Sequence, residues 1–298
     1  MVGTTLAERP ALRTPAVQVA GALLREKLRT VRRCERGVRA ADVDAVHDMR
    51  VGTKRLRETI RLFQPALPPR GTKRYLHAVN GLNDTLGQAR DPDVQLVALA
   101  DLEQACSCPS CLAPITARLL AQRAEAQSTV VACLDQLDQT RLWRRFRRFA
   151  DRLQSAPRGP TVRSLAQRVV PERLLQALEL EPPARDPDAP EALHRLRIAV
   201  KRVKYAIEPF RALFAGALDP AYGLISDLQD ALGDTHDADV LIQLLNGDDG
   251  QRAEAEGVAC CLEVARRRRE RRFEDAMMLL DEMRDRRITH LLLDPLDY

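Results

Sequence analysis

Two segments of the chain carry a histidine followed by cations at helical spacing. The first consists of His47, Arg50, Lys54, Arg57 and Arg61. On a helix that turns by about 100° per residue, the four cations share one flank, next to an apolar stripe and with few carboxylates in line. Guanidinium groups fork onto phosphate oxygens, and lysine adds a point charge. The spacing therefore predicts a helix flank that binds a polyanion, with the histidine contributing when a nearby anion raises its pKa.

The same pattern returns about 147 residues later. Its members are His194, Arg197, Lys201 and Lys204, with Glu208 in the place of the last cation. Segments 82–94 and 228–240 also share a pattern, Leu-x-Asp-x-Leu-Gly-x-x-x-Asp-x-Asp-Val, at an offset of 146. Two blocks at nearly the same offset predict a tandem duplication. A cationic flank kept in both copies, despite repulsion between like charges, points to an anionic ligand.

The composition predicts an all-α fold. The chain is rich in Ala, Leu, Arg and Glu, and no segment shows the sustained alternation of a strand. Helices are predicted over 16–39, 43–64, 72–86, 91–105 and 115–155, and again over 161–180, 190–214, 219–233, 237–245 and 251–287. Pro and Gly at 155–160 mark the boundary between the two halves. The predicted domains are a leader over 1–15, a first helical bundle over 16–155, a second over 156–290 and a tail over 291–298.

The glycine and aspartate of the second repeated block predict a break between helices. Gly87 and Gly233 suit the position just after a helix, and Asp91 and Asp237 suit the cap of the next one. The alternative role for the block is to orient a site arginine such as Arg90.

The seven cysteines stand at irregular spacing, which is not typical of a disulfide framework. Three of them, Cys106, Cys108 and Cys111, raise the question of zinc. A closed zinc site needs four ligands, and no histidine or further cysteine is close in sequence. We therefore predict no metal and no cofactor, and the role of these cysteines stays open.

Charge and hydropathy limit the class of protein. The 298 residues include 47 Lys plus Arg against 42 Asp plus Glu, a net charge of +5. Arginine clusters at 141–148 and 266–272 carry apolar residues at helical spacing and are expected to be solvated, with buried stems. No apolar run approaches the roughly 20 residues that span a bilayer, and the first fourteen residues lack the apolar stretch of a secretory signal. We expect a protein of the reducing cytoplasm that binds no membrane.

The two histidine helices and the two Leu-Gly-x-x-x-Asp blocks resemble the CHAD family, the conserved histidine α-helical domain. The resemblance extends from about residue 16 to about residue 283. It implies two antiparallel helical bundles related by pseudo-twofold symmetry, with a basic surface or pore between them. It also implies binding of inorganic polyphosphate, association with polyphosphate granules and a separate triphosphate tunnel enzyme as a partner. The polyphosphate-binding residues that it implies are His47, Arg50, Lys54, Arg55, Arg57, Lys73, Arg74, His194, Arg197, Lys201, Arg202 and Lys204.

The leading hypothesis is a non-catalytic polyphosphate-binding protein, and two other classes of function remain alternatives. The His-Asp pairs at 47–48 and 236–237 are of the kind that hold metals in HD-type phosphohydrolases. Asp44-x-x-His47 and Glu191-x-x-His194 mimic the spacing of a di-iron ligand pair. The His-Asp pairs do not occupy equivalent positions in the two copies, and both acids of the second motif fall in a first helical turn, where an acid suits the helix dipole. Nucleic acid would use the same cations through its phosphates. No catalytic residue is assigned.

Overall fold

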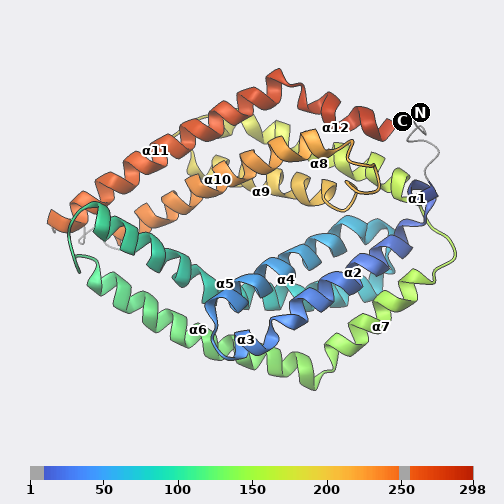
Figure 1. The fold of residues 1–298 in the computed structure, drawn as a ribbon, viewed down its shortest axis with the longest axis horizontal. Coiled ribbons are helices and arrows are strands. Elements are labelled where there is room, and N and C mark those ends of the chain that lie inside the picture. Colours follow the sequence, from blue (N-terminus) through green and yellow to red (C-terminus); the bar gives the residue numbers. More distant parts are fainter. Residues whose placement is uncertain (1–9, 248–255, 298) are drawn as a thin grey trace. The chain divides into compact units, whose positions relative to one another are not determined.

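The computed structural model describes residues 10–247 and 256–297 (Figure 1). All regular elements in these ranges are helices. Pro15 and Thr161 form an isolated β-bridge. No helix in the described ranges is long and apolar enough to cross a membrane. The predicted all-α fold is confirmed.

The helices are α1 (Pro10–Arg13), α2 (Ala16–Arg33), α3 (Glu35–Arg39), α4 (Val43–Phe63), α5 (Pro69–Ala105), α6 (Ala113–Gln139), α7 (Leu142–Gln154), α8 (Val162–Ala184), α9 (Pro190–Ile207), α10 (Asp219–Asn246), α11 (Glu256–Asp285) and α12 (Ile288–Asp297). A 3-10 turn over Gln64–Ala66 follows α4. Helix α9 ends earlier than the predicted residue 214. Pro209 explains this, because Glu208 is still helical and Pro209 has no backbone N–H with which to continue the helical hydrogen bonds.

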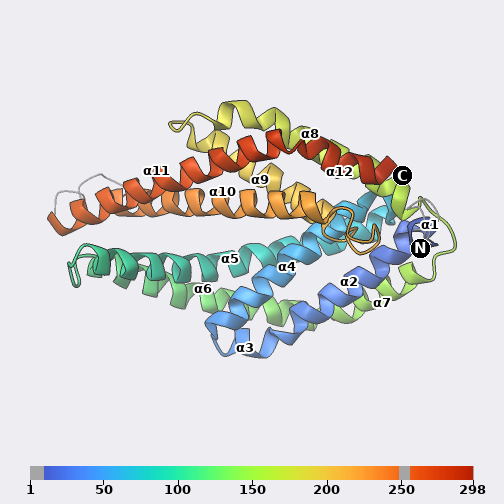
Figure 2. The same cartoon turned by 45° about the horizontal axis from the view of Figure 1, so that its top comes forward.

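The described residues divide into two compact units. Residues 13–97 and 113–165 form one, called the α4 unit below, and residues 10–12, 98–112, 166–247 and 256–297 form the other, called the α9 unit. In the α4 unit, α2 packs against both α4 and α7. In the α9 unit, α10 packs against both α9 and α11 (Figure 2). Each predicted basic helix therefore lies against a long neighbouring helix of its own unit.

The predicted leader and tail lie partly in described helices. Residues 1–9 of the leader are outside the described ranges, whereas Leu12 in α1 is buried. In the segment predicted as a tail, α12 continues to Asp297 and buries Leu292 and Leu296. The side-chain amide of Gln167 donates a hydrogen bond to the carbonyl oxygen of Leu296 at 2.8 Å. This end of the chain therefore packs within the α9 unit.

The predicted helix break at the repeated block is wrong. Helix α5 runs unbroken through Gly87 and Asp91, and α10 runs unbroken through Gly233 and Asp237. Neither glycine is among the described residues with positive φ. Pro92 lies inside α5, where it removes one backbone hydrogen bond. Because both long helices bury apolar residues before and after the block, tertiary packing outweighs the local signal.

Two ion pairs occupy equivalent places in the two units. In the α4 unit, Arg123 Nε lies 2.6 Å from Asp93 Oδ1 and joins α6 to α5. In the α9 unit, Arg269 Nε lies 2.9 Å from Asp239 Oδ1 and joins α11 to α10. Asp239 follows Asp93, and Arg269 follows Arg123, by the same 146 residues that separate the two copies of the repeated block. The tandem duplication stays a prediction, which these equivalent contacts support.

Candidate functional site

The first basic flank lies on α4, whose start is fixed by an N-cap. Asp42 accepts hydrogen bonds from the backbone N–H groups of Asp44 and Ala45, at 2.9 and 3.1 Å. Met49 and Ile60 are buried on the apolar side of the helix. The cations are thereby turned to the adjoining flank, as the sequence predicts.

Acids restrain the cations of the α4 flank. Arg50 Nη1 lies 2.9 Å from Asp91 Oδ1, and Glu58 pairs with Arg57 and also with Arg61, at 3.0 Å in each case. The prediction that few carboxylates face this flank is therefore wrong in part. Asp91 comes from α5, so a helical wheel of α4 alone cannot show it.

Arg50 still has unused donor capacity. Its Nε atom is buried and has no hydrogen-bond partner in the described part of the chain. Its side chain is 22% exposed, whereas that of Asp91 is 58% exposed. An anion could therefore bind the exposed part of the Arg50 guanidinium while the well-solvated carboxylate of Asp91 holds that guanidinium in place.

The second basic flank lies on α9. Lys204 Nζ lies 4.0 Å from Asp230 Oδ1 on α10. His194 meets a second histidine instead of an acid, since its Nδ1 lies 3.3 Å from Nδ1 of His236 and the two ring centroids are 4.5 Å apart. Sequence alone did not indicate this pair, because position 236 is equivalent to Arg90 in the first copy.

The charge of this histidine pair is set by burial and by a neighbouring cation. Burial, and then the positive charge of Arg197, lower the pKa of His194 below its usual range. Burial, Arg197 and His194 in turn lower the pKa of His236. Both rings are therefore mainly neutral near pH 7, and one donates its Nδ1 proton to the other. From the sequence, a bound anion is expected to raise the pKa of His194. In the protein without an anion, the pKa of His194 is lowered instead.

Two of the predicted residues lie apart from the flanks. Arg55 lines a groove of about 690 Å³ that also contains Asp44 and Asp48, between α2 and α4. Arg202 lines a groove of about 410 Å³ with Glu179, between α8 and α9. The remaining predicted cations of α4 and α9 share a flank with their histidine. Lys73 and Arg74 are exposed near the start of α5.

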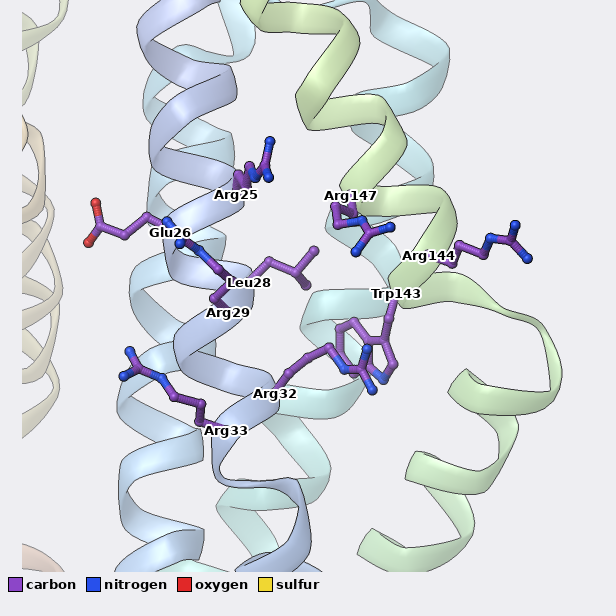
Figure 3. A pocket seen from close by; sticks show the side chains of 9 residues that line it. All are labelled: Arg25, Glu26, Leu28, Arg29, Arg32, Arg33, Trp143, Arg144 and Arg147. Carbon is purple, nitrogen blue, oxygen red and sulfur yellow. The ribbon is translucent and has the colours of Figure 1, made fainter.

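A further basic groove was not predicted as a site. It has a volume of about 850 Å³, lies between α2 and α7, and is lined by Arg25, Glu26, Leu28, Arg29, Arg32, Arg33, Trp143, Arg144 and Arg147 (Figure 3). Figure 3 shows Arg32 beside the ring of Trp143, while Arg144 points away from α2. Trp143 is 4% exposed, so its ring is not available for stacking on bases. We call this feature the arginine groove.

The predicted metal-ligand alternatives do not converge. In residues 10–247 and 256–297, the group of His, Cys, Asp or Glu side chains close enough to hold a metal ion consists of Cys108, Cys111 and Cys261. The His-Asp pairs at 47–48 and 236–237 contribute to no such group. The structure therefore gives the HD-type and di-iron alternatives no assembled ligand set in the described ranges.

A family model identifies the family of the chain, and two solved structures are similar to it in fold. A family model described as the CHAD domain matches residues 22–246. The crystal structure of the CHAD domain from the plant Ricinus communis is similar over 92% of this chain and 94% of that chain, with 23% identity and a TM-score of 0.69. PptA from Streptomyces chartreusis is similar over 90% of this chain and 100% of that chain, with 19% identity and a TM-score of 0.66. A search of curated proteins found no match. The range matched by the family model includes both histidine helices.

Proposed function

The chain belongs to the CHAD family, and we propose that it binds inorganic polyphosphate without hydrolysing it. The observation that carries the proposal is the repeated basic flank. In each unit one helix presents a histidine and three cations, with its apolar side buried in that unit. A flank that occurs twice suits a ligand that is itself repetitive.

The spacing of the cations suits a linear polymer of phosphates. Arg50, Lys54 and Arg57 follow one another by about 6 Å and about 4.5 Å along the axis of α4, and Arg197, Lys201 and Lys204 do the same on α9. Every phosphate unit of the polymer carries negative charge, so each cation can meet one. A long polymer can engage both flanks because one chain carries them, and this raises its affinity over that of a short one.

Binding alone accounts for the groups present on the flanks. Three acids, Asp91, Glu58 and Asp230, form ion pairs with cations of the flanks. An acid paired in this way orients a cation, which suits a binding role more than general-base catalysis. We also propose that the protein collects on polyphosphate granules in the cytoplasm and works beside a separate triphosphate tunnel enzyme, as the family resemblance implies.

Titration with polyphosphate of defined length tests this proposal. We expect saturable binding that a chelator leaves unchanged, with no release of orthophosphate on long incubation. At equal phosphate concentration, polyphosphate should displace duplex or single-stranded DNA, and DNA should not displace polyphosphate. Release of orthophosphate would contradict the non-catalytic part of the proposal, and preferential binding of DNA would favour the nucleic-acid alternative.

A further inference from the structure

Five of the seven cysteines gather within the α9 unit, where the turn after α5 meets the first turns of α11 (Figures 1 and 2). Cys108 Sγ and Cys111 Sγ lie 3.6 and 3.8 Å from Cys261 Sγ. Cys106 lies close enough to Cys260 and Cys261 to influence the pKa of both thiols. Cys261 is buried, and Cys260 is exposed. The polyphosphate-binding flanks do not use this cluster.

We propose that Cys108, Cys111 and Cys261, whose sulfur atoms all lie within 4.8 Å of one another, bind one zinc ion in the reduced protein, and that the nearby Cys106 moves in as the fourth ligand. Four sulfurs placed tetrahedrally around zinc, each about 2.3 Å from the metal, are about 3.8 Å from one another. The two distances to Cys261 Sγ, 3.6 and 3.8 Å, fit this geometry. Cys108 and Cys111 are joined as a disulfide in the structure. The zinc site uses the same two sulfur atoms as thiolates.

The backbone around the cluster is shaped for this convergence. Ser107 and Ser110 have φ of 49° and 66°, in the left-handed region, and so curl the turn that carries the first three cysteines. At Gly257 in α11, a Cβ atom would lie 2.8 Å from Cβ of Cys111. Because glycine has no Cβ, the start of α11 can approach the turn closely enough for Cys261 to reach it.

The chemistry of the donors favours zinc. Four thiolates select zinc or iron among the common metals, and zinc needs no change of redox state. A bound zinc ion deprotonates the thiols that coordinate it and releases their protons. The resulting site would tie the end of α5 to the start of α11.

Metal analysis of the reduced protein tests this proposal. The full chain is purified without chelator, anaerobically and with reductant, and its metals are measured by mass spectrometry. The zinc-free protein is then titrated with Co²⁺. We expect one zinc per chain and, with Co²⁺, the intense thiolate-to-cobalt absorption of a tetrahedral sulfur site.

Serine variants locate the ligands. Cys111→Ser and Cys261→Ser should lose the zinc and the cobalt absorption. Cys260→Ser should keep both, as should Cys34→Ser and Cys133→Ser, whose cysteines lie in the α4 unit. Circular dichroism shows whether each variant is folded, and the wild-type result stands even where a variant is not.

Three outcomes would overturn the proposal. These are reduced, folded wild-type protein without zinc or cobalt–thiolate absorption, iron in place of zinc, and full zinc content in Cys261→Ser. Polyphosphate binding is measured in parallel on the zinc-loaded and zinc-free proteins. Zinc binding depends on none of the residues of the basic flanks, so failure of either idea leaves the other standing.

Discussion

Replacing Asp91 by asparagine should strengthen polyphosphate binding. Asp91, on α5, holds Arg50 of the α4 flank at 2.9 Å. Its negative charge orients the guanidinium, but it also repels any phosphate that the same guanidinium binds. Asp91→Asn keeps the size of the side chain and removes this repulsion.

The size of the effect follows from the distances involved. A phosphate on the far side of the Arg50 guanidinium would be about 6.5 Å from the Asp91 carboxylate. At an effective dielectric constant of about 40 to 80, suited to this exposed carboxylate, the repulsion is about 0.6 to 1.3 kcal/mol. Removing it should raise the affinity by about threefold to ninefold at low salt. Unfolding free energy should change by less than about 1 kcal/mol, because exposed ion pairs contribute little to stability.

The assay is a titration with fluorescently labelled polyphosphate at low ionic strength. Asp151→Asn is the matched control, since Asp151 pairs with Arg25 of the arginine groove at 2.8 Å and both side chains are well exposed. We expect tighter binding for Asp91→Asn and unchanged binding for Asp151→Asn. The reverse result would place the polymer in the arginine groove. Unchanged or weaker binding by folded Asp91→Asn would refute the reasoning for Arg50.

Three further predictions concern pH and packing. Polyphosphate affinity should fall as pH rises from about 5.5 to 8. A bound anion raises the pKa of His194, which is lowered in the free protein, so binding takes up a proton. The double variant His47→Gln with His194→Gln should show a flatter dependence of affinity on pH. Folding lowers the pKa values of His194 and His236, so both side chains stabilise the folded protein above about pH 6.5. This contribution to the free energy of unfolding should be lost as pH falls through the pKa values of the folded protein. Thermal melts at pH 7.5 and pH 5.5 measure the loss. Gly21→Ala should cost about 1 to 3 kcal/mol, because its Cβ would lie 2.6 Å from a backbone oxygen of α7, whereas Gly81→Ala has open space and should not destabilise the fold.

The sequence predicts most helices and both basic flanks, because these depend on local periodicity. Buried Leu56 and Val200 lie on the apolar sides that the helical wheel indicates. The predicted break at Gly87 failed because capping residues were judged without the packing of α5 against its neighbours. The pairing of Arg50 with Asp91 depends on the same packing and could not be read from either helix alone.

Two other features differ in how far the sequence could have shown them. The approach of Cys261 to Cys111 spans a sequence separation of 150 residues, and only the fold brings the two sulfurs together. The arginine groove, by contrast, leaves a readable signal. Arg25, Arg29 and Arg32 recur at helical spacing in one segment, and pairing that segment with the cluster at 141–148 would have indicated the groove.

The salt dependence of polyphosphate affinity tests the central claim most directly. Wild type, Lys54→Ala, Lys201→Ala and the double variant are titrated over a range of salt. The control is Arg286→Ala, which removes an exposed cation just after the end of α11. By analogy with nucleic acid, each lost phosphate contact should make the slope of log affinity against log salt shallower by about 0.7 to 0.9. We predict one such step for each single variant, two for the double variant and none for the control. A wild-type slope in the folded double variant would show that the two flanks do not bind the polymer.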